Sequence, residues 1–229
     1  MTKEEYELRR DELFRRWLEA RPYYDDEGKE FTYDGISDFQ EWINQKPQIL
    51  FLLKEAWQGY HPYFPNQKVY GKFCVNIARW KLAIKEIYAY PEIFPNFMEA
   101  WQRPKYNNDI AIVEVKKVNE ELSRSNNNTI NSYAMQDSAF LREQIDLINP
   151  LVVVCCGTST AYSDFIYGDD EWKMIYSIQE PKPCACFNHN NRLVIDFYHP
   201  TLIATSPRMM FDLLCRLLIE GKVFANFDW

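Results

Sequence analysis

The chain has 229 residues, of which 47% are hydrophobic and 26% are charged. This composition excludes a disordered chain and is typical of a single well-packed domain. The formal net charge of −7 excludes strong non-specific binding to nucleic-acid phosphates, although a local basic patch can still bind DNA weakly. There is no apolar run of roughly 18 residues and the N-terminus is densely charged, so we expect no membrane partner, no secretory signal and a cytoplasmic location.

The six cysteines are expected to be thiols in a reducing compartment. Cys155-Cys156 and Cys184-Ala185-Cys186 lack the usual spacings of zinc or iron-sulfur ligands. Buried apolar thiols are therefore the favoured interpretation, and a metal site is the minor alternative. We expect no metal and no cofactor.

The first residues, about 1–46, are predicted to form a helical extension. Thr2 and Glu5 have the spacing of a capping box, and a helical apolar stripe follows them. Ser37 is expected to cap a second short helix, which Pro47 ends.

Continuous apolar runs then predict strands that are buried on both faces, as in a parallel sheet. They cover residues 48–54, 109–116 and 151–156. Helices are expected between them, over 73–88 and in a long segment that ends at Leu147.

The C-terminal third begins with a turn at Gly157 that leads into a helix near 161–167. Asn190-Asn191 lies between two strand-like segments and predicts a tight hairpin. Ser206 and Pro207 predict the start of a last amphipathic helix over 207–220.

This alternation of helices and strands predicts an α/β fold. We expect a three-layer α/β/α sandwich with a central, mainly parallel sheet of about four strands and an added antiparallel hairpin strand. No internal repeat or domain boundary is visible, so the whole chain, 1–229, is expected to form one domain.

Polar residues follow the predicted strands where ligands usually bind. In open α/β sheets, ligands bind outside the carboxyl ends of the strands. Glu55, Glu114, Gly157 and His199 each lie at or near such an end. We therefore expect them to line one site.

Four segments resemble the motifs of the uracil-DNA glycosylase superfamily, in the family's order, over roughly residues 48–205. ILFLLKEAWQG resembles its first motif, IAIVEVKKV its second strand, and INPLVVVCCGTSTAY its Pro-strand-Gly segment. His199-Pro200-Thr201 resembles its His-Pro-Ser motif. The resemblance implies a nucleobase ligand and hydrolysis of an N-glycosidic bond in DNA without a cofactor. The sequence departs from the family pattern at Lys54, Ala56, Trp57 and Glu114.

The resemblance also implies roles for three residues. Glu55 would position or activate water, and His199 would donate a hydrogen bond to the charge on the departing base. Glu114 stands where the family reads the base with Asn. An ionised carboxylate only accepts hydrogen bonds, so it favours the adjacent donors of a guanine-like edge and repels O4 of uracil. Because Ala56 replaces a water-activating residue of some relatives, we expect slow or absent activity on uracil.

Further residues are candidates for contacts with the base or with DNA. Trp57, Tyr60 and Phe64 are a candidate stacking floor, or they fold back on the core. Gly157, Thr158 and Ser159 are a candidate phosphate site, or a helix cap. Thr201, Leu202 and Ile203 form a candidate DNA-contacting loop, in which the apolar residues are alternatively core. The candidate basic contacts are Lys54, Lys116, Lys117 and Arg208.

Other functions stay open at this point. His199 is alternatively a structural histidine, and Glu55 and Glu114 are alternatively partners of neighbouring lysines. A catalytically inactive member of the same fold that binds a nucleotide or a protein is the main alternative. A nucleophilic Cys156–His199 pair is a lesser one, because the residues around Cys156 lack a hydrolase elbow. There is no dinucleotide fingerprint and no P-loop.

Overall fold

A computed structural model describes residues 1–25, 30–55, 71–102, 109–119, 126–168, 170–201 and 205–229. The α-helices are α1 (Lys3–Ala20), α2 (Phe39–Ile43), α3 (Gly71–Ala89), α4 (Phe97–Gln102), α5 (Asn127–Gln136), α6 (Ser138–Ile148) and α7 (Pro207–Glu220). The strands are β1 (Glu30–Phe31), β2 (Gly35–Ile36), β3 (Ile49–Glu55), β4 (Ala111–Lys116), β5 (Val118–Asn119), β6 (Val152–Cys156), β7 (Lys173–Ile178), β8 (Cys184–His189) and β9 (Arg192–Phe197). Short helices of other types are η1 (Pro22–Asp25), η2 (Ala161–Ile166) and η3 (Val223–Asn226).

The central sheet has seven strands in the order β2-β4-β3-β6-β9-β8-β7. Its middle strands β4, β3, β6 and β9 are parallel to one another, while β2 at one end and β8 and β7 at the other are antiparallel to their neighbours. The α/β class is therefore confirmed. The expected number of about four strands was too low, because it covered little more than the parallel core.

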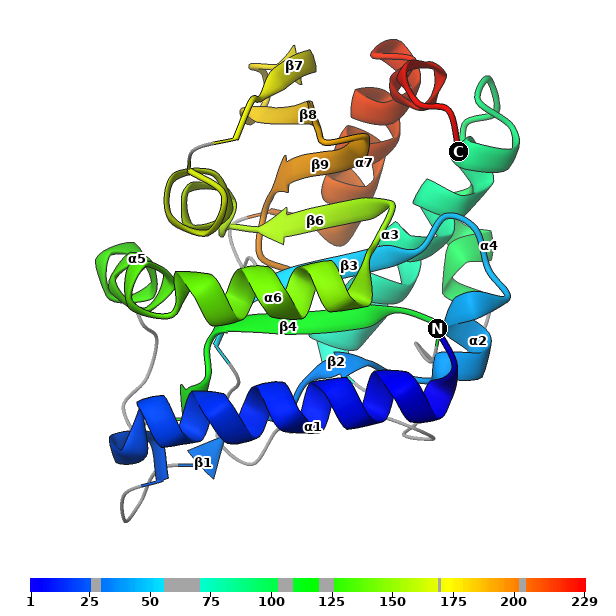
Figure 1. Ribbon diagram of the computed structural model, residues 1–229. Coiled ribbons are helices and arrows are strands. Elements are labelled where there is room, and N and C mark those ends of the chain that lie inside the picture. The colour runs from blue at the N-terminus through cyan, green and yellow to red at the C-terminus, as the bar shows by residue number, and fades with distance from the viewer. Residues whose placement is uncertain (26–29, 56–70, 103–108, 120–125, 169, 202–204) are drawn as a thin grey trace.

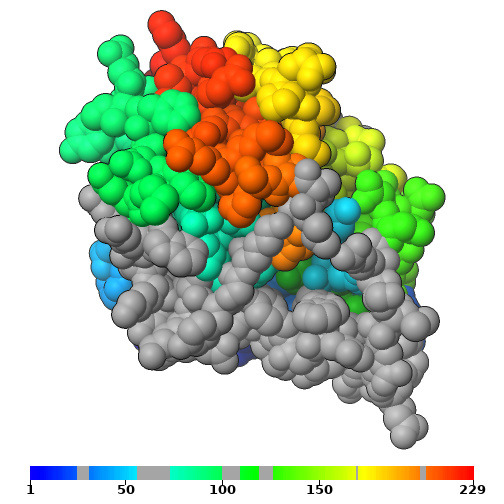
Figure 2. All heavy atoms as spheres, turned by 180° about the vertical axis from the view of Figure 1, so that it is seen from behind, coloured from blue at the N-terminus to red at the C-terminus, as the bar shows by residue number. Residues whose placement is uncertain are grey.

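Helices cover both faces of this sheet (Figure 1). On one face, α3 and α7 pack against strand residues such as Phe51 and Ile195 through Trp80 and Phe211. On the other face, α1 and α6 pack with η2 against alternate strand residues. Seen from behind, α7 and the C-terminal segment fill the centre and top of the surface, beside α3 and α4 (Figure 2).

The N-terminal extension is part of this sandwich. The capping box of Thr2 and Glu5 is confirmed at the start of α1. Beyond α1, the extension adds β2 to the edge of β4, where Ile36 pairs with Ala111. The Tyr6 hydroxyl accepts a hydrogen bond from the Ile36 N–H at 3.1 Å, which ties α1 to this edge strand. The prediction of a helical extension over about 1–46 was therefore incomplete, because this segment also adds strand β2 to the sheet.

Several local predictions were wrong. Asp38, not Ser37, caps α2, because its carboxylate accepts from the N–H groups of the first turn. The long helix before β6 is broken at Asp137, whose buried carboxylate accepts from the Tyr24 hydroxyl. Strand β7 was not expected. The helix expected near 161–167 is present over 161–166, as a π-helix.

Other predictions are confirmed. Asn190 and Asn191 both have positive φ, 51° and 59°, in the tight turn between β8 and β9. Ser206 caps α7, and Pro207 is at its first position. In the described part of the chain, no helix has the length and apolar character needed to cross a membrane.

Candidate functional site

Strand register brings the predicted acidic residues to one part of the sheet. Glu114 on β4 pairs with Leu53 on β3. Two residues further along both strands, Lys116 pairs with Glu55. Leu53 belongs to the apolar cluster beneath α3, and residues directly paired on neighbouring strands share a face. Glu114 and Glu55 therefore lie diagonally to each other on the α3 face, with Glu55 nearer the carboxyl ends of the strands.

His199 reaches the same edge from β9. Cys156 on β6 pairs with Phe197, which is two residues before His199, and both belong to the cluster beneath α3. The Asn76 side chain on α3 donates a hydrogen bond to the Pro200 carbonyl at 2.7 Å and so anchors the loop that carries His199. The structure thus brings Glu55, Glu114 and His199 to one region of the sheet.

The His199 ring has a defined donor and a defined acceptor. Its Nδ1 accepts a hydrogen bond from the Thr201 N–H at 3.3 Å and lies 2.9 Å from the Thr201 hydroxyl. Burial and, to a smaller extent, the charge of the Lys54 ammonium lower the pKa of His199 to about 4, against the opposite effect of Glu55. The neutral ring therefore carries its proton on Nε2, which is left as a hydrogen-bond donor.

Glu55 is joined to a buried lysine. The Lys116 ammonium lies 3.0 Å from Glu55 Oε2, and the Lys116 side chain is only 2% exposed. The same ammonium lies 5.5 Å from the centre of the Tyr133 ring. Since Lys116 is enclosed, its charge acts on Glu55 and cannot contact a DNA phosphate.

Glu114 is almost fully enclosed. Its side chain is 3% exposed, and among the described residues its Oε2 has no hydrogen-bond partner. Burial raises the pKa of Glu114 well above its usual range. The charges of Asp34 and Glu55 add to this, while Lys117 opposes them. The expectation of an ionised carboxylate at this position does not fit these surroundings.

A buried polar group beside Glu114 was missed by the sequence analysis. Asp34 accepts hydrogen bonds from the Glu114 N–H at 2.6 Å and from the Gln144 side chain at 2.6 Å. The Lys117 ammonium lies 2.6 Å from the same carboxylate, and neither side chain of this ion pair is exposed. Asp34 is separated from these partners by about a third of the chain or more, so no local pattern could have identified it.

The turn after β6 uses its polar groups within the fold. The Gly157 N–H donates to the Phe197 carbonyl at 2.8 Å. The Thr158 hydroxyl donates to the Leu52 carbonyl at 2.8 Å, and Ser159 hydrogen-bonds Asp196. The helix that follows is a short π-helix. These contacts support the structural interpretation of Gly157, Thr158 and Ser159 rather than a phosphate site.

The four candidate basic residues also contact other side chains of the protein. Lys116 and Lys117 are buried in ion pairs, so their assignment as DNA contacts was wrong. Lys54 donates to the Asn127 side chain at 2.7 Å. Arg208 is 68% exposed and lies 3.6 Å from Asp212. Of these four, Arg208 is the most accessible to solvent.

Some candidates cannot be placed. Trp57, Tyr60 and Phe64 lie outside the described residues, and so do Ala56, Leu202 and Ile203. Thr201 is described and exposed, and it holds the His199 ring.

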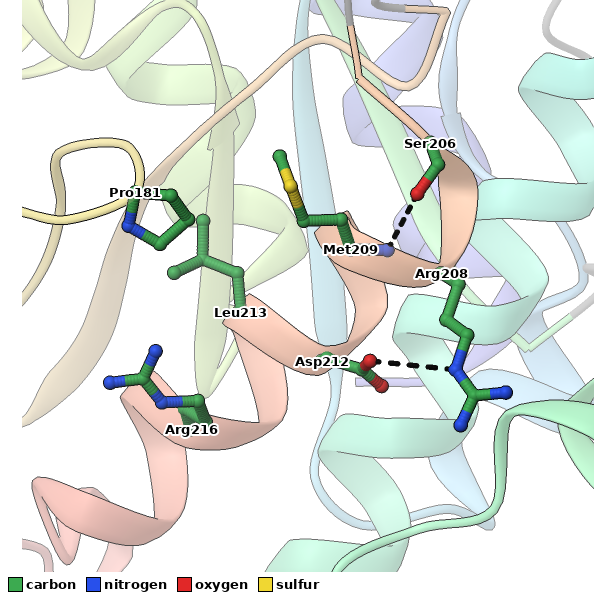
Figure 3. Close-up of a pocket in the computed structure, with 7 residues that line it drawn as sticks. All are labelled: Pro181, Ser206, Arg208, Met209, Asp212, Leu213 and Arg216. Atoms are coloured by element: carbon green, nitrogen blue, oxygen red, sulfur yellow. Dashed lines mark hydrogen bonds and ion pairs between the residues drawn. The ribbon is translucent and has the colours of Figure 1, made fainter.

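A cavity among the described residues lies elsewhere, on the outer side of α7 (Figure 3). It has a volume of about 320 Å³ and opens widely to solvent. Arg208 and Asp212 line it as an ion pair, with Pro181 and Leu213 as its apolar part. None of Glu55, Glu114 and His199 lines this cavity.

The cysteines do not form a reactive or metal-binding group in the described part of the chain. Burial raises the pKa of the Cys156 thiol well above its ordinary value, which disfavours a nucleophilic Cys156–His199 pair. Five of the six cysteines are buried. No group of three His, Cys, Asp or Glu side chains among the described residues is arranged to hold a metal ion.

A second buried histidine lies at the opposite edge of the parallel strands, where β9 begins. His189 stacks on Trp172 at 4.5 Å, and its two ring nitrogens lie 3.1 Å from the Tyr162 hydroxyl and 2.8 Å from Asp170. Arg192 donates to the Tyr162 hydroxyl at 3.2 Å. This cluster holds the β8–β9 turn against η2.

Comparison of the sequence with protein-family models and with curated proteins finds no match.

Proposed function

We propose that the carboxyl ends of β3, β4 and β9 form a nucleobase site, and that the protein hydrolyses an N-glycosidic bond in DNA in the manner of the uracil-DNA glycosylase superfamily. The observation that carries this proposal is the state of His199. Its Nδ1 is engaged by Thr201, so the neutral ring offers an Nε2–H donor close to Glu55.

In such a reaction, the bond between sugar and base breaks and negative charge develops on the departing base. A donor aimed at that charge stabilises the transition state more than the ground state. His199 supplies this donor without itself being charged. Glu55 orients the attacking water, and Lys116 holds the carboxylate in place through their ion pair. The step needs no cofactor.

The test is His199→Ala on oligonucleotides that carry uracil, hypoxanthine or xanthine. Loss of one donor to a developing charge typically lowers the rate about 10²–10³-fold. Base release should fall by that factor while the melting temperature changes little. A wild-type protein that releases none of the three bases would contradict the glycosylase proposal for those substrates.

One observation favours the alternative, an inactive member of the same fold that binds a nucleotide or a protein. Lys116 already engages Glu55 Oε2 at 3.0 Å, which leaves this oxygen less available to hold a water molecule. In that case, the wild-type protein binds a base but does not cleave its N-glycosidic bond. Under either proposal, binding to duplex DNA is weak and falls with salt, because the net charge is −7 and two of the four candidate cations are buried.

A further inference from the structure

The strongest unexplained feature of the site is the carboxyl group of Glu114. It lies on the α3 face of the sheet, two residues before Lys116 on β4, and Lys116 pairs with Glu55 on β3. It is 3% exposed, and Oε2 has no partner among the described residues. A buried ionised carboxylate without a hydrogen bond is strongly unfavourable, so such groups usually become neutral or bind a partner.

The lysines nearest to Glu114 are already matched by other acids. On β4, the Lys117 ammonium pairs with Asp34 and the Lys116 ammonium pairs with Glu55. Among the described residues, these two ion pairs match two cations with two anions, and Glu114 is a third acid beside them.

The described ionisable groups on the other elements near Glu114 are neutral or have partners of their own. The nearest ionisable group on β6 is the Cys156 thiol, which burial keeps neutral. His199 after β9 is neutral for the same reason. On α3, the Arg79 guanidinium lies 4.2 Å from the centre of the Phe97 ring, and Lys81 pairs with Asp109 at the amino end of β4.

We propose that Glu114 acts in this site as a neutral carboxylic acid that donates one hydrogen bond and accepts another, so that the site takes a base edge with an acceptor beside a donor. This inference rests on the proposed nucleobase function and deepens it. A neutral acid has one O–H donor and one carbonyl acceptor, whereas an ionised carboxylate only accepts. A base edge with two adjacent donors would therefore bind no more tightly than an edge with one donor and one acceptor.

The protonation state can be measured on the protein itself. Infrared difference spectra between wild type and Glu114→Gln are recorded during a pH titration. We expect the carbonyl band of a protonated acid at neutral pH, absent from Glu114→Gln and lost from the wild type as pH rises. Asp109→Asn is the matched control, since this partly buried acid pairs with two lysines and should contribute no such band. A wild-type spectrum without a Glu114 acid band at neutral pH would overturn the inference.

The ligand edge is tested with two soluble nucleosides, 2′-deoxyinosine and 2′-deoxyguanosine. Their bases share an N–H donor beside an O6 acceptor, and guanine adds a second donor. The wild type should bind both alike at neutral pH. Glu114→Gln keeps one donor and one acceptor, so it should retain this binding. Glu114→Ala should bind roughly ten- to a hundredfold more weakly, from the loss of two hydrogen bonds.

The possible results separate the two proposals. Preference for deoxyguanosine, together with loss of binding in Glu114→Gln, means that the ionised form reads the base and overturns the inference. Failure of the wild type to bind either nucleoside overturns the nucleobase function and the assigned edge. The infrared titration then still decides the state of Glu114 by itself.

Discussion

The Asp34–Lys117 pair should be one of the most sensitive positions for folding stability. Lys117→Met keeps the length of the side chain and its packing near Trp17, whose ring centre lies 5.4 Å from the ammonium. It leaves the Asp34 carboxylate buried with only its neutral donors, Gln144 and the Glu114 N–H. Breaking a buried ion pair in this way typically costs about 3–5 kcal/mol. At roughly 2–4 °C per kcal/mol for a chain of this size, the melting temperature should fall by roughly 6–20 °C.

Urea unfolding of the single and double variants tests this estimate. Burial lowers the pKa of Lys117 despite its partner, so the pair itself is not expected to be strongly stabilising. Lys117→Met combined with Asp34→Asn should therefore recover about 1–3 kcal/mol relative to the sum of the single changes. Lys85→Met is the matched control. Lys85 also pairs with a carboxylate, that of the partly buried Asp109, but Lys85 is 27% exposed and Asp109 keeps Lys81, so less than about 1 kcal/mol should be lost. A loss in Lys117→Met no larger than in this control would refute the reasoning.

Three further outcomes are expected. Because the pKa of His199 is lowered from 6.5 to about 4 in the folded protein, stability should be full above about pH 6.5 and fall by on the order of 3 kcal/mol towards pH 4, and His199→Gln should flatten this part of the curve in thermal melts. Thr158→Val should lose about 1–3 kcal/mol in urea unfolding, because the Leu52 carbonyl is left buried without its donor. Gly157→Ala should cost about 1–2 kcal/mol by the same measurement, because φ is 73° and a Cβ would lie 3.2 Å from the Lys54 side chain.

The parallel core could be predicted from the sequence because its signals are local. The runs at 48–54, 109–116 and 151–156 are continuously apolar, and the structure buries nearly all of their residues on both faces. The remaining strands have weaker signals. β7 is an edge strand with a mostly exposed or half-buried pattern, and β1, β2 and β5 have two residues each.

The break between α5 and α6 shows a second limit. The sequence was expected to form one long helix here, yet Asp137 ends one helix and begins the next. Its partners, the Tyr24 hydroxyl and the Arg21 guanidinium, come from the first 25 residues of the chain. A side chain that is fixed by distant partners leaves no periodic pattern for local reasoning to detect.

The relative positions of the three candidate residues could be predicted, but the charges around them could not. The rule that ligands bind at strand carboxyl ends predicts that Glu55, Glu114 and His199 lie together, and strand register brings them to one region of the sheet. The lysines were misjudged because Lys116 and Lys117 look like a solvated pair at a strand end. In the structure both lysines are buried and form ion pairs, Lys116 with Glu55 and Lys117 with Asp34.

Asp34 also shows why the N-terminal extension belongs to the site. The residue lies just before β2, so the strand pairing that adds β2 to the edge of β4 also fixes the Asp34 carboxylate beside the Glu114 N–H. The negative charge of Asp34 helps to keep the Glu114 carboxyl neutral and, at the same time, offsets the charge of Lys117. A change in α1 or β2 that moves Asp34 should therefore alter the hydrogen-bonding character of the proposed site.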